Sequence, residues 1–157
     1  MSYLSELLPV EQIQLQLRGA DKTAVLRELV ALVPEVRNDQ AQRETFVQSL
    51  LEREKLHTTG IGDGIALPHA RNPMGGLLKR PLLVFGRHPG VPFGSLDNKP
   101  VQLLFLLASP NLTDHLSMLA RISRVLRDPP LRSALYTISR PEDLPRLIAE
   151  AEQRMLK

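Results

Sequence analysis

The residues 101–108, VQLLFLLA, and the residues 82–86, LLVFG, are two nearly unbroken apolar runs of strand length. Apolar runs without alternation are typical of strands that are covered on both faces, in the middle of a sheet. The segment 90–98 between them is rich in turn-forming residues, which predicts a connection made of turns. These two central strands predict an α/β fold in which a small mixed sheet is flanked by helices on both faces.

Amphipathic patterns and capping residues place five helices around these strands. The predicted helices run from Asp21 to about Val33, from Asn38 or Asp39 to about Lys55, after Asn111 or Thr113 as far as Asp128, from about Leu131, and from Pro141. In the third of them we expect one apolar face, made of Leu112, Leu116, Leu119, Ile122 and Leu126. Residues 13–18 alternate like a strand with one buried face, and residues 65–70 are expected to enter the sheet. The segment 57–64, HTTGIGDG, holds three glycines and is predicted to be a loop.

The composition limits the classes of function that are open to this chain. Its 157 residues, 43% of them hydrophobic, favour a single domain over residues 1–157. The absence of cysteine excludes disulfides, thiol catalysis and thiolate metal sites, and it fits a reducing compartment. Aromatic residues make up only 4%, which argues against a stacking platform for single-stranded nucleic acid. No apolar run is long enough to cross a membrane and the start lacks a secretion signal, so we expect a cytoplasmic protein without direct membrane insertion.

The charge of the chain is mildly basic and unevenly distributed. The formal net charge is +3, and residues 69–100 hold five basic residues against one acidic residue. No basic run dominates, so we expect no nucleic-acid partner. The basic middle of the chain instead suits an anionic substrate or an acidic partner protein.

The residues that can carry chemistry lie in the stretch 53–69, REKLHTTGIGDGIALPH. Glycine-rich backbone binds anions through its amides, and Pro68 restricts the backbone that holds His69. The spacing G-x-G-x-G follows a helix and is not followed by Gly-Lys-Ser/Thr, which excludes a dinucleotide fingerprint and a Walker A loop. Taken alone, His69 is open to three roles: base, metal ligand or covalent nucleophile.

The same stretch resembles the type-2 enzyme IIA proteins of the phosphoenolpyruvate-dependent phosphotransferase system, the fructose, mannitol and nitrogen-regulatory group. The resemblance rests on REKL at 53–56, TGIGDGIALPH at 59–69, DNKPV at 97–101 and the pair HL at 115–116, and it covers nearly the whole chain. It implies a mixed sheet flanked by helices, in agreement with the fold expected above. It also implies a phosphotransferase subunit that works through a phosphohistidine intermediate. The implied acceptor is His69, with His115 and Arg53 as its neighbours.

Two positions depart from the pattern of this family. His57 stands where glycine is usual, and Asp63 stands where asparagine is usual. We expect the charge of Asp63 to lie beside the loop that meets the phosphoryl group, where it would modestly weaken transfer or alter partner choice.

Phosphoryl transfer between two histidines is chemically close to an exchange of equals, so it needs no metal and no cofactor. An imidazole with an ordinary pKa of about 6.5 is mostly neutral at cytoplasmic pH and is a competent nucleophile. Arg53 can donate two parallel hydrogen bonds to the phosphoryl oxygens. His115, near the start of its helix, can add another, and the helix terminus favours a negative charge there.

Each of these residues also has a structural interpretation. His69 and His115 can be satisfied histidines at a strand end and on a helix face, and Arg53 can be a solvated surface residue. We expect His57 to be an exposed loop residue and His88 to be a turn residue. A zinc site built from His57, His69 and His115 fits the ligand type, but phosphoryl transfer already explains the histidines.

Two functions remain open for a chain of this kind. In the first, the protein relays phosphate from HPr to a sugar-specific IIB protein during uptake. In the second, which we favour, it is a regulatory module that accepts phosphate from HPr or the nitrogen-branch paralogue of HPr. Its phosphorylation state then alters its binding to regulatory targets such as sensor kinases or potassium transporters. We favour the regulatory role because we expect a free-standing chain without a fused IIB or membrane part, and because of the stretch 97–101 and the apolar strand that follows it.

Overall fold

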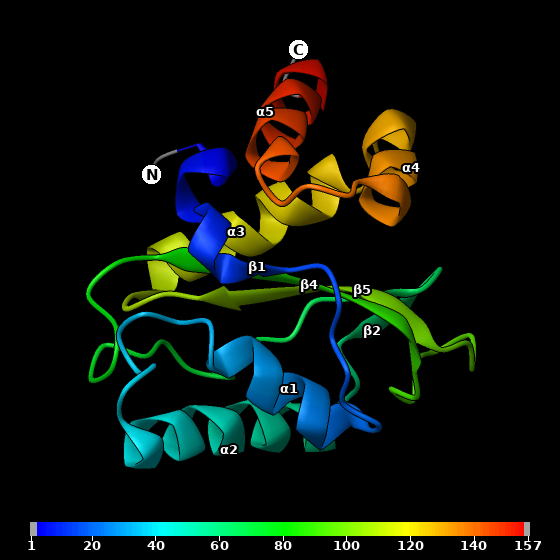
Figure 1. Ribbon diagram of the computed structural model, residues 1–157. Coiled ribbons are helices and arrows are strands. Elements are labelled where there is room, and N and C mark those ends of the chain that lie inside the picture. The colour runs from blue at the N-terminus through cyan, green and yellow to red at the C-terminus, as the bar shows by residue number, and fades with distance from the viewer. Residues whose placement is uncertain (1–2, 156–157) are drawn as a thin grey trace.

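A five-stranded mixed sheet forms the centre of the molecule, as the computed structural model of residues 3–155 shows (Figure 1). Its strands are β1 Ile13–Gln14, β2 Gly60–Gly62, β3 Ile65–Ala66, β4 Leu82–Val91 and β5 Val101–Ala108. They lie in the order β1-β4-β5-β3-β2. The central pair β4–β5 is antiparallel, β1 runs parallel to β4, and β3 runs parallel to β5. The edge strand β2 pairs with β3 in the antiparallel sense.

Helices cover both faces of this sheet. They are α1 Lys22–Val30, α2 Gln40–Leu56, α3 Leu112–Val125, α4 Pro129–Thr137 and α5 Asp143–Met155, preceded by the 3-10 turns η1 Leu4–Leu7 and η2 Val10–Gln12. Figure 1 shows α1 and α2 on one side of the sheet and α3, α4 and α5 on the other. The predicted α/β class, with helices on both faces of a small mixed sheet, is confirmed.

The alternation of side chains along β4 and β5 divides the core into two layers. Phe85 and Phe105 face α3 and α5, and their ring centroids are 4.7 Å apart. Val84 and Leu104 point the other way and pack with α1 and α2. Both faces of the central strands are therefore dry, which is why these two segments read as continuous apolar runs.

Several boundaries follow the predicted capping residues. Asp21, Asp39 and Asn111 each accept a hydrogen bond from a backbone amide in the first turn of the following helix. These bonds satisfy amides that would otherwise lack a partner at a helix start. The strand at 101–108 has the predicted bounds.

Three expectations about the elements were wrong. The strand predicted at 13–18 pairs only over Ile13–Gln14, although the amide of Leu17 still donates to the carbonyl of Arg87. The predicted loop 57–64 contains the strand β2, because the glycines allow a tight hairpin with β3. The strand predicted at 82–86 continues through the expected turn region to Val91.

The inner face of α3 also differs from the expected one. Leu112 and Leu116 are each 56% exposed, whereas His115 is buried together with Met118 and Ile122. Counting apolar residues selects the leucines, because it gives no weight to an imidazole on the inner face. The helix instead turns His115 toward the sheet and leaves two leucines at the surface.

Over residues 3–155, none of the helices combines the length and the apolar character that a membrane crossing requires.

Candidate functional site

His69 lies at the end of the sheet, just beyond β3. The amide of Leu107 in β5 donates to the carbonyl of Pro68, and His69 forms a single parallel bridge with Leu107. These two contacts with Leu107 hold Pro68 and His69 beside β5, and the imidazole of His69 is partly buried.

A backbone carbonyl fixes the tautomer of this imidazole. The Nδ1 atom of His69 lies 2.7 Å from the carbonyl oxygen of Leu67. A carbonyl oxygen only accepts, so Nδ1 carries the proton and donates it. The lone pair of the neutral ring is then on Nε2, the nitrogen that is free to react.

His115, in α3, packs beside His69. It lies in the second turn of α3, where its amide donates to the carbonyl of the N-cap residue Asn111. The centroids of the two imidazole rings are 5.5 Å apart, at an interplanar angle of 59°. The residue is only 5% exposed. The two histidines, which are 46 positions apart in the sequence, are thus brought together by the fold.

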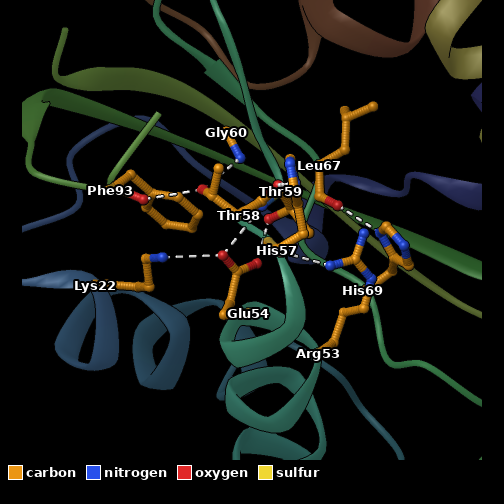
Figure 2. A network of polar contacts seen from close by, with 10 residues as sticks. All are labelled: Lys22, Arg53, Glu54, His57, Thr58, Thr59, Gly60, Leu67, His69 and Phe93. Atoms are coloured by element: carbon orange, nitrogen blue, oxygen red, sulfur yellow. Dashed lines mark hydrogen bonds and ion pairs between the residues drawn. The ribbon is translucent and has the colours of Figure 1, made fainter. Parts of the chain in front are cut away.

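Arg53 reaches the same place from the last turn of α2. Its Nη1 donates to the carbonyl oxygen of His57 at 2.5 Å, and Figure 2 shows its guanidinium next to the imidazole of His69. One guanidinium nitrogen is used by this bond, and the residue forms no ion pair with a carboxylate within residues 3–155. A held but electrostatically uncompensated guanidinium is suited to bind an anion.

Glu54 anchors the segment that carries Arg53, and sequence reasoning gave this residue no role. Its carboxylate accepts from the amide of Thr59 at 3.1 Å and from the hydroxyl of Thr59, and it pairs with Lys22 at 3.0 Å (Figure 2). The ammonium of Lys22 lies 4.4 Å from the ring centroid of Phe93. This network joins the end of α2 to the start of β2. The Glu54 side chain at its centre is buried, with only 4% of its surface exposed. No signal in the sequence marks it, because the burial of Glu54 and its contacts with Lys22 and Thr59 arise only in the fold.

The surroundings of His69 keep its imidazole neutral. Burial is the main cause that lowers the pKa of His69, and the charges of Arg53 and His115 lower it further. The bond to Leu67 and the charge of Glu54 oppose this shift without reversing it. Burial likewise lowers the pKa of His115. Both rings are therefore uncharged near neutral pH, which preserves the lone pair of a nucleophile.

The glycine-rich hairpin tip lies at the opposite end of β5. Gly62, Asp63 and Gly64 all have positive φ, of 94°, 56° and 78°, as a tight turn between β2 and β3 requires. The carbonyl of Gly64 accepts from the amide of Gln102 at the start of β5. His69 bridges to Leu107, five residues further on, so the tip and His69 are separated by about 16 Å of extended strand.

Asp63 therefore lies away from His69, the residue on which the resemblance places the phosphoryl group. Its carboxylate pairs with Arg132 of α4 at 3.3 Å, and its amide donates to Asp97. Its carbonyl accepts from the hydroxyl of Tyr136 at 3.1 Å. A residue that tolerates positive φ is needed at this point, and aspartate, like asparagine, does so.

The other two histidines are not part of this cluster. His57 is exposed, and its Nδ1 donates to the carbonyl of Thr58. His88 lies in β4 rather than in a turn, and both of its ring nitrogens are used: Nε2 donates to Gly19 and Nδ1 accepts from Gly90. Among residues 3–155 there is no group of three metal-ligating side chains that could hold an ion.

The sequence of this chain is similar to a known protein family and to several of its members. Residues 6–151 match the family described as "Phosphoenolpyruvate-dependent sugar phosphotransferase system, EIIA 2". A nitrogen regulatory protein of Bradyrhizobium diazoefficiens is 40% identical over 128 residues, which cover 80% of this chain and 80% of that protein. The fructose-specific EIIA component of Haloferax volcanii is 32% identical over 151 residues, which cover 94% of this chain and 95% of that protein.

Solved structures are similar over almost the same range. The nitrogen regulatory protein IIA-Ntr from Neisseria meningitidis superposes with a TM-score of 0.81 at 30% identity, over 94% of this chain and 99% of that one. Enzyme IIA for mannitol from Escherichia coli, in its complex with phosphorylated enzyme IIB, gives a TM-score of 0.75 at 25% identity, over 90% of this chain and 96% of that one. The resemblance in sequence, the fold and these matches agree, and the chain belongs to the EIIA 2 family of the phosphoenolpyruvate-dependent sugar phosphotransferase system.

Proposed function

We propose that His69 is the phosphoryl acceptor of this protein and that its Nε2 atom forms the bond to phosphorus. The observation that carries the proposal is the hydrogen bond from Nδ1 to the Leu67 carbonyl, which leaves Nε2 as the free nucleophile. The lowered pKa of His69 supports it, because a neutral ring is the reactive form.

In this step the N–P bond of the donor's phosphohistidine breaks as the Nε2–P bond of His69 forms. The donor imidazole leaves as a neutral ring that keeps the proton on its other nitrogen. The proton on Nδ1 of His69 stays in its bond to Leu67, so no proton is released and no base is needed. Such a transfer depends on in-line positioning and on stabilising the charge of the equatorial oxygens.

Arg53 and His115 supply that stabilisation in our proposal. The guanidinium beside His69 donates to the phosphoryl oxygens, and the His115 ring, 5.5 Å from that of His69 between centroids, donates from the opposite side. Neither role requires a metal or a cofactor.

We propose that the donor is HPr or its nitrogen-branch paralogue, and that docking uses the apolar side chains near His115. Leu112 and Leu116 are exposed on the same helix as this histidine. A transient encounter of this kind buries about 1,200 Å² or less in total. We place this relay in the cytoplasm and assign it to one domain over residues 1–157, as the sequence predicts.

The downstream role divides into two branches, and we favour the nitrogen-regulatory one. Its support is the 40% identity with a nitrogen regulatory protein and the similarity to the Neisseria structure. The alternative is a sugar-specific IIA that donates phosphate to a IIB protein. The fructose-specific relative and the mannitol complex favour that second branch.

Labelling with a phosphorylated carrier tests the acceptor. Wild-type protein should gain one acid-labile phosphoryl group by intact-mass spectrometry, and His69→Ala should gain none. His57→Ala and His88→Ala are the matched controls and should label like the wild type. Undiminished labelling of His69→Ala would refute the assignment.

Onward transfer tests the branch. The phosphorylated protein is mixed with a panel of IIB domains and, separately, with candidate regulatory proteins. Transfer of the phosphoryl group to a IIB domain supports the sugar-specific role, whereas binding that depends on phosphorylation without transfer supports the regulatory role.

A further inference from the structure

A cavity of about 320 Å³ lies at the end of the sheet opposite His69. Arg87 in its wall pairs with Leu103 in the β4–β5 ladder, while His69 bridges to Leu107. Four residues of extended strand, about 13 Å, separate the two places. The cavity is therefore distinct from the histidine cluster.

Its walls combine apolar side chains with two guanidinium groups. Leu15, Leu17 and Pro89 provide apolar surface, and Arg18 and Arg87 provide positive charge. No acidic residue lines the cavity. A lining of this kind, mostly apolar with a few convergent polar groups, is typical of small-molecule sites, whose volumes begin near 300 Å³.

The two arginines have no acidic partner within residues 3–155. Arg87 is half-buried, and its Nη1 donates to the carbonyl of Leu135 at 3.1 Å, which holds the guanidinium in place. Neither Arg87 nor Arg18 forms an ion pair in this part of the chain. The nearby carboxylate of Glu28 is occupied by the backbone amides of Arg18 and Gly19.

Apart from the exposed Gln16, each remaining polar side chain of the lining forms a hydrogen bond within the protein. His88 uses both ring nitrogens, the amide nitrogen of Gln102 donates to Pro89, and the hydroxyl of Tyr136 donates to Asp63. These bonds make the wall rigid. A ligand would therefore meet the unused donors of the two guanidiniums and the side-chain amide of Gln16.

We propose that this cavity binds a small organic anion, a carboxylate or a phosphate ester with an apolar body about the size of one ring. The guanidinium of Arg87 recognises the anionic head, because its planar set of donors matches two oxygens at once. Leu15, Leu17 and Pro89 cover the apolar body. The site does not depend on the phosphoryl-transfer role.

Four probes separate the head from the body in a titration followed by ¹H–¹⁵N NMR of the full chain. Benzoate and phenyl phosphate carry both parts, inorganic phosphate carries only the head, and benzamide carries only the body. We expect benzoate or phenyl phosphate to shift the amide signals of residues 15–18 and 87–90 with a Kd of about 1 mM. Inorganic phosphate and benzamide should bind at least about 10-fold more weakly. The tighter of the two aromatic probes identifies the head as carboxylate or phosphate.

Variants of the arginines complete the test. Arg87→Met should weaken binding of the better probe by about 10-fold or more, and Arg18→Gln, an exposed position, by about 3-fold. Arg127→Met removes an exposed arginine outside the lining and should leave the Kd unchanged. Arg87→Met also loses the bond to Leu135, so thermal unfolding checks that this variant is folded. If Arg87→Met is unfolded, the Kd of Arg18→Gln alone tests the proposal. Absence of shifts at residues 15–18 and 87–90 with both aromatic probes, or equal affinity in folded arginine variants and wild type, would overturn the proposal.

Discussion

An arginine lies near each end of β5, but the two arginines differ in their partners. At the start of the strand, the hairpin tip Gly62–Gly64 meets an arginine and a tyrosine, and the carboxylate, amide and carbonyl of Asp63 are all paired within the protein. At its far end, His69 also meets an arginine, but Nε2 and most of the guanidinium donors stay free. An arginine with its own carboxylate is part of the structure, whereas one without is available to a ligand.

The motif TGIGDGIALPH at 59–69 contains both the glycines that shape the hairpin and, at its end, His69. The glycines of TGIGDGIALPH make the turn and the close approaches of β2: a Cβ at Gly60 would lie 2.2 Å from the hydroxyl oxygen of Ser95. The proposed chemistry resides in the last residue of the motif, His69. Substitutions at the two ends should therefore affect different properties.

The largest difference in phosphorylation rate is expected between variants of Arg53 and variants of Arg132. Arg53→Gln should slow phosphorylation of His69 by about 100-fold, because a lost charge-stabilising donor costs that much in comparable transition states. Arg53→Lys should recover only part of the rate, since an ammonium lacks the planar pair of donors. Rates are measured by quenched-flow labelling from the phosphorylated carrier. Arg132→Gln, at the hairpin tip, is the matched control and should stay within about 2-fold of wild type. Equal losses in Arg53→Gln and Arg132→Gln would erase the distinction between the ends.

A smaller loss is expected at His115. His115→Ala should still accept phosphate but should pass it on about 10-fold more slowly, because one donor to the phosphoryl oxygens is missing. The onward rate is measured with a IIB domain that accepts from the wild type. A wild-type onward rate would show that His115 only packs against His69.

The pH dependence sharpens the description of the acceptor end. The pKa of His69 lies below its ordinary value of 6.5, mainly through burial, so labelling should be level from pH 8 to about pH 6.5 and decline only below that. An NMR titration of the His69 ring protons gives the pKa directly. A pKa above 6.5 would contradict the buried, neutral ring.

The same shifts predict how stability changes with pH. A histidine whose pKa is lowered by folding binds more protons when unfolded, so the free energy of unfolding falls as the pH falls through about 6.5. Urea unfolding at pH 7.5 and pH 5.5 measures this loss. The double variant His69→Gln/His115→Asn should lose less between the two pH values than the wild type does.

The smallest effect is expected at Asp63. Asp63→Asn removes the ion pair with Arg132, in which the aspartate side chain is 74% exposed, and keeps a residue that tolerates positive φ. An exposed ion pair contributes about 0–1 kcal/mol, so thermal unfolding should shift only slightly. The labelling rate should change by less than about 2-fold. A large gain in rate would mean that the charge of Asp63 acts at His69 after all.

The central part of the fold could be predicted from the sequence because local patterns dominate there. The runs in β4 and β5 are apolar on both faces, and the caps Asp21, Asp39 and Asn111 act within three residues. Such features require no knowledge of distant segments. The hairpin β2–β3 is not predicted by the same patterns, because glycine locally disfavours a strand and the pairing with β3 becomes visible only in the fold.

The geometry of the candidate site was less accessible to sequence reasoning. That Arg53, His69 and His115 lie together came from the resemblance to a family, since no local pattern relates α2, β3 and α3. The predicted inner face of α3 was right for Ile122 and Leu126 and wrong for Leu112 and Leu116. The buried His115 packs against His69, which is remote in sequence. The anchoring role of Glu54 depends on Lys22 and Thr59 and could not be seen without the fold.

The bond between Nδ1 of His69 and the carbonyl of Leu67 has a consequence for how this protein can change over time. Its acceptor is a main-chain atom, so substitution of a neighbouring side chain cannot delete it as long as the Leu67-Pro68-His69 backbone keeps its path. In the function that we propose, substitutions at Arg53, His115 or the exposed leucines of α3 would then change the rate of transfer and the choice of partner. The ring nitrogen left free, Nε2, would stay the same, because the backbone sets it.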